Sequence, residues 1–277
     1  MFLMPSVMSE GPRGAIMASR GGLDMASRGG LDMSTAMDNG QGQYARSHVQ
    51  AWARIAGFLF VVTIFAGGFG EGYAPAQLVV SNDAAATVAN LKAHDMLYRL
   101  SFACYLIEAL CDVAIAVIFY VLLKPAGRVL ALMTLFIGLL STALYAACEI
   151  FYFGLPQLLL RGSGYLGTFT PQQLGTLTLL SLKLFNYGAG LFLVFYGTGW
   201  IIRGVLMIHS GYFPKVLGLL MIVGGLGFVV STILEVLAPQ YSSPYLLFAF
   251  APGGILLALW LLIRGINVDK WQEKAAI

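Results

Sequence analysis

Charged residues are scarce in this chain: they make up 10% of its 277 residues, whereas about a quarter is usual in soluble domains. Cysteine and histidine are rarer still, with three residues of each. All three cysteines fall inside apolar runs, which excludes an extracellular disulfide framework and a zinc ribbon. The histidines are too far apart for a motif such as His-Glu-x-x-His. We therefore predict neither a metal site nor a cofactor.

The residue patterns of nucleic-acid binding and of acyl-transfer catalysis are also missing. No basic patch interleaved with aromatic residues is present, so we expect no nucleic-acid partner. The sequence has no Gly-x-Ser-x-Gly nucleophile elbow, and no Ser, His and Asp lie at a shared depth. We expect that the protein is not an enzyme. An intramembrane enzyme is kept as a third alternative, although no nucleophile has a base at its own depth.

Apolar residues, by contrast, are abundant. They make up 58% of the chain, the mean hydropathy is +0.80, and they gather in six long runs. About 20 such residues in a helix cross a hydrocarbon core of about 30 Å. The sequence therefore predicts an all-α, polytopic transmembrane helical bundle. We expect its spans at about residues 52–73, 97–123, 129–153, 174–208 and 216–237, with a sixth that ends at Arg264.

Three regions are expected along the chain. Residues 1–45 contain a tandem repeat of MASRGGLD and no means of forming a core, so we predict a disordered amino-terminal tail. Residues 46–267 form the six-helix membrane domain, and 268–277 form a cytoplasmic tail. Between the first two spans, Asp83 and the residues before it predict a capped short helix at the membrane surface. We expect a loop at about 154–171.

Basic residues indicate how the bundle is oriented, because loops rich in Lys and Arg stay in the cytoplasm. The other side of the predicted bundle has few of them: Lys92, Arg99 and Arg161, with Lys183 near its edge. We therefore expect both termini to be cytoplasmic. The basic residues on the richer side are Arg46, Arg54, Lys124, Arg128, Arg203, Lys215, Arg264, Lys270 and Lys274.

Two carboxylic acids lie deep in the second apolar run. Glu108 and Asp112 are one helical turn apart, so they share one face of a helix. An uncompensated charge at the centre of a bilayer costs roughly 2.5 to 3.5 kcal/mol on insertion scales. Two explanations stay open. The pair binds a ligand or an ion, or it belongs to a hydrogen-bonded network that holds helices together.

Further polar residues are expected near the outer ends of other spans. Glu71, Glu149 and Glu235 fall there in the first, third and fifth spans, and Lys183 lies in the fourth. With Glu108 and Asp112 they would form an acidic vestibule open to the outside. The alternative is interfacial solvation for the three glutamates and snorkelling for Lys183. Two glycines in the first span, at positions 68 and 72, predict a close helix contact.

Several stretches of the chain resemble a known family. They include DAAATVANLKAHDMLYRLSF at 83–102, Leu-Cys-Asp-Val-Ala at 110–114, and His-Ser-Gly-Tyr-Phe-Pro-Lys at 209–215. These stretches are similar to domain of unknown function 4386, a family of uncharacterised bacterial membrane proteins. The resemblance implies a multi-pass protein of the bacterial plasma (inner) membrane with no assigned reaction.

Two functions from different classes follow from these residues. The first is an integral membrane protein that binds a small ligand or a cation in an outward-facing acidic cavity, as a transporter or a sensor does. The alternative is a structural or accessory membrane subunit that has no ligand and packs against a membrane protein partner. In both hypotheses the lipid bilayer surrounds the chain.

Overall fold

The structure is a computed structural model that describes residues 47–162, 164–241 and 243–276. Within these residues it is helical and has no strand. Among the described residues, six helices are long and apolar enough to cross a membrane, which confirms the predicted number of spans and makes this a multi-pass membrane protein. The spans are Ser47–Leu78, Asp95–Ala126, Arg128–Arg161, Pro171–Ser210, Lys215–Leu237 and Tyr245–Ile263.

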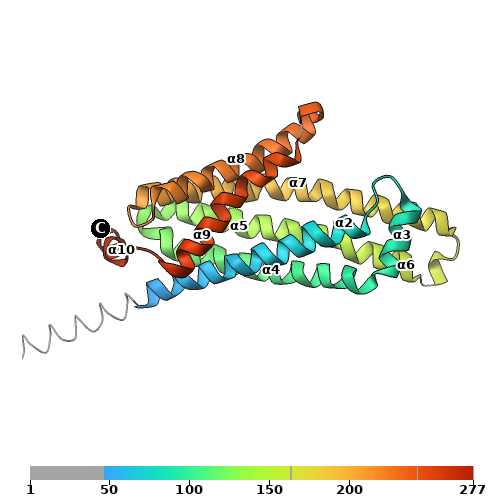
Figure 1. Ribbon diagram of the computed structural model, residues 1–277, viewed down its shortest axis with the longest axis horizontal. Coiled ribbons are helices and arrows are strands. Elements are labelled where there is room, and N and C mark those ends of the chain that lie inside the picture. The colour runs from blue at the N-terminus through green and yellow to red at the C-terminus, as the bar shows by residue number, and fades with distance from the viewer. Residues whose placement is uncertain (1–46, 163, 242, 277) are drawn as a thin grey trace, which may run out of the picture. The chain divides into compact units, whose positions relative to one another are not determined.

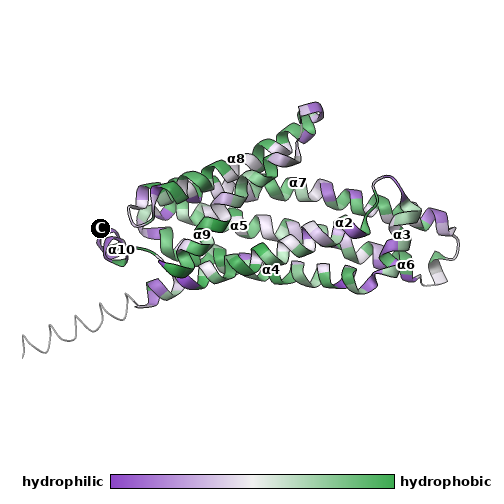
Figure 2. Cartoon of the chain, in the orientation of Figure 1, coloured by the Kyte–Doolittle hydropathy of each residue, from purple (hydrophilic) through white to green (hydrophobic). Residues whose placement is uncertain are grey.

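Apolar residues cover the middle of the helices, and hydrophilic residues gather toward their ends and the connections (Figures 1 and 2). Residues 47–67 form the α-helical part of the first span. The elements after them are η1 (Gly68–Tyr73), α2 (Ala74–Leu78), α3 (Ala84–Ala93), α4 (Asp95–Leu123), η2 (Lys124–Ala126), α5 (Arg128–Glu149), η3 (Ile150–Gly154), α6 (Leu155–Arg161), η4 (Gly164–Leu166), α7 (Pro171–Ser210), α8 (Lys215–Leu237), η5 (Pro239–Tyr241), η6 (Pro244–Phe250), α9 (Ala251–Ile263) and α10 (Val268–Ala275).

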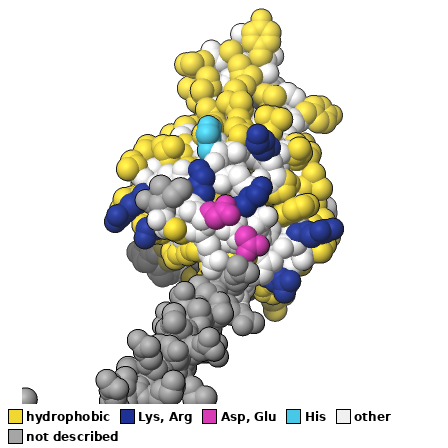
Figure 3. All heavy atoms as spheres, turned by 90° about the vertical axis from the view of Figure 1, so that its left-hand side faces the viewer, with side chains coloured by type: hydrophobic (Ala, Val, Ile, Leu, Met, Phe, Trp, Pro, Cys, Tyr) yellow, Lys and Arg dark blue, Asp and Glu magenta, His cyan; other side chains and the backbone are white. Residues whose placement is uncertain are grey.

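The first span begins at the same end of the bundle at which the sixth span finishes. The side-chain amide of Gln50 donates a hydrogen bond to the carbonyl of Arg264, over 2.7 Å. The helix α10 packs on this end, where the indole N–H of Trp271 donates to the carbonyl of Leu122 over 3.0 Å. Lys and Arg side chains gather on the same end (Figure 3). The predicted tail at 1–45 lies outside the described residues.

Two prolines shape the first and third spans. Each follows a π-helical turn: η1 precedes Pro75, and η3 precedes Pro156. A proline has no N–H to donate and its ring crowds the carbonyl four residues earlier, so the helix widens locally. In both turns a backbone N–H bonds to the carbonyl five residues back, from Ala74 to Phe69 and from Leu155 to Ile150.

Side chains of neighbouring helices hydrogen-bond to carbonyls in the second π turn. The hydroxyl of Tyr98 in α4 donates to the carbonyl of Tyr152, the residue four before Pro156. The hydroxyl of Ser181 in α7 donates to the carbonyl of Phe151, over 2.6 Å. Because lipid offers no donors, such bonds stabilise an interrupted helix in a membrane. The loop predicted at about 154–171 is therefore wrong in its first half: the third span continues as α6, and the connection starts at residue 162.

Helices α7 and α8 approach so closely that only glycine fits at their crossing. A Cβ atom built on Gly204 would lie 2.5 Å from the carbonyl oxygen of Gly218, and the reverse distance is 2.6 Å. Gly197 and Gly225 show the same reciprocal relation, at 2.6 and 2.5 Å. Small residues let helix backbones meet in membranes, where packing replaces the hydrophobic effect as the driving force. On each helix the two glycines at the crossing are seven residues apart, so they lie on one face of the helix.

Two shorter features also follow from local sequence. The carboxylate of Asp83 accepts a hydrogen bond from the backbone N–H of Ala86 over 2.8 Å, so the predicted cap of α3 is confirmed. The helix α7 ends at Ser210. The next residue, Gly211, has a φ of 76°, in the left-handed region in which many helices end.

Candidate functional site

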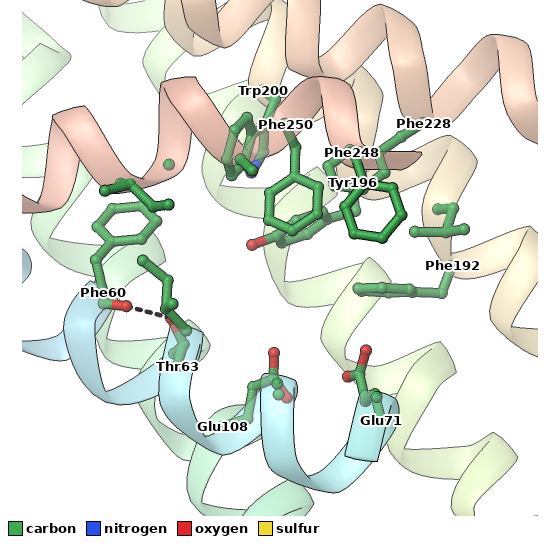
Figure 4. A pocket seen from close by; sticks show the side chains of 18 residues that line it. Phe60, Thr63, Glu71, Glu108, Phe192, Tyr196, Trp200, Phe228, Phe248 and Phe250 are labelled. Carbon is green, nitrogen blue, oxygen red and sulfur yellow. Dashed lines mark hydrogen bonds between the residues drawn. The ribbon is translucent and has the colours of Figure 1, made fainter. Parts of the chain in front are cut away.

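A cavity of about 500 Å³ lies between the first span, α4, α7, α8, η6 and α9 (Figure 4). Most of its wall is apolar, and a large share of that wall is aromatic. Its lining residues are Phe60, Thr63, Ile64, Gly67, Gly68, Glu71, Gly72, Glu108, Phe192, Leu193, Tyr196, Trp200, Phe228, Phe248, Phe250, Ala251, Gly254 and Ile255.

Two of the predicted carboxylic acids, Glu71 and Glu108, meet at this cavity. Glu71 belongs to the π turn η1, and Glu108 lies near the middle of α4. The carboxyl group of Glu71 faces that of Glu108 and also the hydroxyl group of Tyr145. Both carboxyl groups point from one wall toward the aromatic side chains on the other (Figure 4). Among the described residues, no Lys, Arg or His is in ion-pair contact with either acid.

Glycines of the first span make room for the acids, but these are not the glycines that the sequence suggested. A Cβ atom on Gly67 would lie 3.0 Å from a carboxyl oxygen of Glu108, and one on Gly70 would lie 3.0 Å from the carbonyl oxygen of Ser101. Gly68 and Gly72 line the cavity and have no atom within 4 Å of such a Cβ. The predicted close contact at Gly68 and Gly72 is therefore wrong. These two face the cavity, and Gly67 and Gly70 face α4.

Glu149 lies beside this site, in a buried cluster behind the cavity wall. Its side chain is 4% exposed and faces the hydroxyl group of Tyr105, and its charge interacts with that of Glu71. Neither carboxyl oxygen of Glu149 has a hydrogen-bond partner within the described part of the chain. The rings of Tyr105 and Tyr145 pack at a centroid distance of 4.4 Å. Glu149 ends α5 at the second π turn, just as Glu71 lies in the first.

Asp112 lies one turn beyond Glu108 and interacts electrostatically with a different group, the guanidinium of Arg203 in α7. Within the described residues the two do not come into ion-pair contact. Arg203 is 3% exposed, and its guanidinium lies 5.6 Å from the ring centroid of Phe119. The sequence places Arg203 among the basic residues of the cytoplasmic side, and the structure adds that its side chain is buried among α4, α5 and α7. A Cβ on Gly138 of α5 would lie 3.0 Å from it.

The remaining two candidate residues lie away from the cavity. The ammonium group of Lys183 donates a hydrogen bond to the side-chain carbonyl of Asn82 over 3.0 Å, at the exposed connection before α3. Glu235 is exposed near the end of α8 and is not part of the cavity lining. The structure therefore brings together Glu71, Glu108 and Glu149, places Asp112 beside Arg203, and leaves Lys183 and Glu235 apart.

The aromatic wall and the burial of Arg203 are not predicted by the sequence patterns above. A signal for them exists in α7, where Phe192, Tyr196, Trp200 and Arg203 follow one another at spacings of four, four and three residues. Residues so spaced lie on one face of a helix. In isolation such a stripe is also typical of ordinary core packing, so its meaning depends on the carboxyl groups that face it from the first span and α4.

The chain is 27% identical over 164 residues to an uncharacterized protein of the archaeon Archaeoglobus fulgidus, an alignment that covers 57% of this chain and 80% of the relative. No solved structure matches the chain. Residues 55–265 match the family described as "Domain of unknown function (DUF4386)". Since this match covers most of the membrane domain and more than half of the chain, the protein belongs to the DUF4386 family.

Proposed function

We propose that this protein binds a small, positively charged ligand in the cavity at Glu71 and Glu108, as a transporter or a sensor in the bacterial plasma membrane. The observation that carries the proposal is the pairing of these two carboxyl groups at a cavity wall, with no described cation in contact with either. Two carboxylates side by side repel one another, strongly so where the dielectric constant is low. A cation bound between them offsets that repulsion.

The orientation that we propose places both termini in the cytoplasm and the cavity toward the outside. It is supported by the Lys and Arg side chains that gather on the end of the bundle that carries α10 (Figure 3). The cavity extends from the middle of the bundle toward the opposite end, because Glu108 is half-way along α4 and Glu71 comes late in the first span.

Thermal unfolding of the purified protein in detergent tests the proposal. A ligand that binds only the folded state raises the melting temperature as its concentration exceeds its Kd. The panel contains the chlorides of sodium, potassium, magnesium, choline and tetraphenylphosphonium. We expect at least one to raise the melting temperature of the wild type and to lose this effect in Glu71→Gln and Glu108→Gln. Glu235→Gln is the matched control, since Glu235 lies outside the cavity lining.

The proposal is wrong if every cation in the panel leaves the wild type unchanged, or if the Gln variants respond as the wild type does. The first result would favour the second candidate function, a structural or accessory subunit without a ligand. Buried groups that join helices support that candidate, namely Asp112 beside Arg203 and Glu149 beside Tyr105. If it is right, Glu108→Gln lowers the melting temperature while no ligand raises it.

A further inference from the structure

The cavity opens through the flank of the bundle, between the first and sixth spans. Near its beginning the first span touches α9 closely, since a Cβ atom on Gly57 would lie 2.4 Å from the backbone nitrogen of Leu262. Farther along, α9 runs away from the first span toward η6 (Figure 1). Glu71, Gly72 and Phe248 all line the cavity and are all exposed, with Phe248 65% exposed. The mouth therefore lies between η1 and η6.

The surface around this mouth is apolar. Phe65 in the first span is 75% exposed, and Ile255 in α9 is 45% exposed. Both belong to segments that are apolar enough to cross a membrane. An opening on such a surface faces lipid rather than water, so a molecule that passes through it needs an apolar body.

The wall opposite the two acids is a continuous aromatic cluster. Trp200 packs edge-on against Phe228 with ring centroids 5.8 Å apart, Phe228 stacks on Phe250 at 5.2 Å, and Tyr196 lies 5.7 Å from Phe228. Aromatic ring faces attract organic cations electrostatically, and several rings together form the usual recognition site for quaternary ammonium groups. Carboxyl groups on one wall and aromatic rings on the other therefore suit a charge carried on an apolar body.

The same cavity is poorly suited to a metal ion. Its volume of about 500 Å³ falls within the range of small-molecule sites, and a bare ion would leave most of it unfilled. Calcium and magnesium take six or more oxygen ligands. Within the described residues, no three His, Cys, Asp or Glu side chains are grouped so that they could hold a metal ion.

A buried donor on the aromatic wall also lacks a partner. Trp200 is 3% exposed and lines the cavity, and its indole N–H lies near the hydroxyl group of Tyr196 but makes no hydrogen bond among the described residues. Figure 4 shows the indole nitrogen on the side of the ring that faces the cavity. A buried donor of this kind is costly unless it is paired, so an acceptor group on a bound molecule would stabilise the complex.

We infer that the ligand is a lipid-soluble organic cation that enters sideways from the bilayer between the first and sixth spans. Its charge lies at Glu71 and Glu108, and its apolar body lies against Tyr196, Trp200, Phe228 and Phe250. This inference rests on the proposed function and narrows it to one class of ligand.

Binding to the protein in lipid nanodiscs tests the ligand class, with empty nanodiscs as the blank. The probes are tetraphenylphosphonium, neutral triphenylphosphine oxide, and the chlorides of potassium and magnesium. We expect tetraphenylphosphonium to bind and the other three not to bind. Phe228→Leu and Phe250→Leu are each expected to raise its Kd about 2- to 30-fold, the range that the loss of one cation–ring contact gives. Phe65→Leu, an exposed phenylalanine outside the cavity lining, is the matched control and is expected to bind as the wild type does.

Gly72→Phe tests the route of entry. The position lies at the mouth, and a Cβ atom added there would have no atom within 4 Å, so the backbone admits a side chain that narrows the mouth. We expect the association of tetraphenylphosphonium to slow several-fold; an unchanged association rate would overturn the sideways route.

The outcomes separate this inference from the proposed function. If potassium or magnesium binds in a manner that Glu108→Gln abolishes, while tetraphenylphosphonium does not bind, the ligand class is wrong and the proposed cation site stands. Unchanged tetraphenylphosphonium binding in both Phe→Leu variants likewise overturns the ligand class alone. If triphenylphosphine oxide binds as tightly as tetraphenylphosphonium, charge plays no part and both proposals fail.

Discussion

The crossing of α7 and α8 gives the most direct stability prediction, through the substitution Gly204→Ala. The added methyl group would lie 2.5 Å from the carbonyl oxygen of Gly218 and 2.7 Å from a side-chain carbon of Ile222. An ordinary contact needs about 3.5 Å or more. The obstacle is backbone, so one helix must move away from the other by nearly an ångström. Overpacking of this kind costs about 1–3 kcal/mol.

The measurement is the melting temperature in detergent. At about 2–4 °C per kcal/mol for a chain of this size, Gly204→Ala is expected to lower it by about 2–12 °C. Gly199→Ala is the control on the same helix, because its methyl group would meet Ile137 at an ordinary 3.5 Å. Alanine favours helix over glycine by about 1 kcal/mol, so the control should equal or exceed the wild type. Equal melting temperatures for the two variants would refute the idea that the crossing depends on glycine.

Two further predictions concern the buried charge and the first π turn. Asp112→Asn and Arg203→Met are each expected to destabilise the protein. The loss in the double variant is expected to be smaller than the sum of the single losses by about 0.5–3 kcal/mol, because a lone buried charge is costlier than none. Additive losses in a double-mutant cycle of melting temperatures would show that the two groups do not interact. Pro75→Ala restores a backbone N–H, so the π turn that carries Glu71 can relax to an α-helix. We expect this substitution to weaken cation binding at least severalfold. The melting temperature without ligand is not expected to fall. An unchanged Kd for tetraphenylphosphonium would show that the turn does not depend on the proline.

Much of the fold could be predicted because the apolar runs are long and contain few ionisable residues. A run of about 20 apolar residues has few alternatives to a transmembrane helix, and this requirement acts within each segment separately. The cap of α3 likewise depends only on neighbouring residues, because Asp83 bonds to the N–H of Ala86. The third span was predicted too short because Pro156 suggests a break, although the π turn and the hydroxyl groups of Tyr98 and Ser181 accommodate it.

The candidate site could be predicted only in part. The apolar surroundings of Glu71, Glu108 and Glu149 are visible in the sequence, and the structure places these residues near one another. Lys183 and Glu235 have similar surroundings in the sequence but lie elsewhere, because rotation of a helix about its axis depends on its neighbours. The sequence places Arg203 with the basic residues of the cytoplasmic side but does not show that its side chain is buried beside Phe119.

The sequence by itself determined that six segments are long and apolar enough to cross a membrane, and which of their residues can carry charge. These properties depend on the exchange of water for lipid around each segment. Only the tertiary structure decided that Gly67, and not Gly68, makes room for Glu108, that Asp112 faces Arg203, and that an aromatic wall lies opposite the two acids. Such pairings depend on how closely and at what rotation the helices pack, and packing is a property of all six spans together.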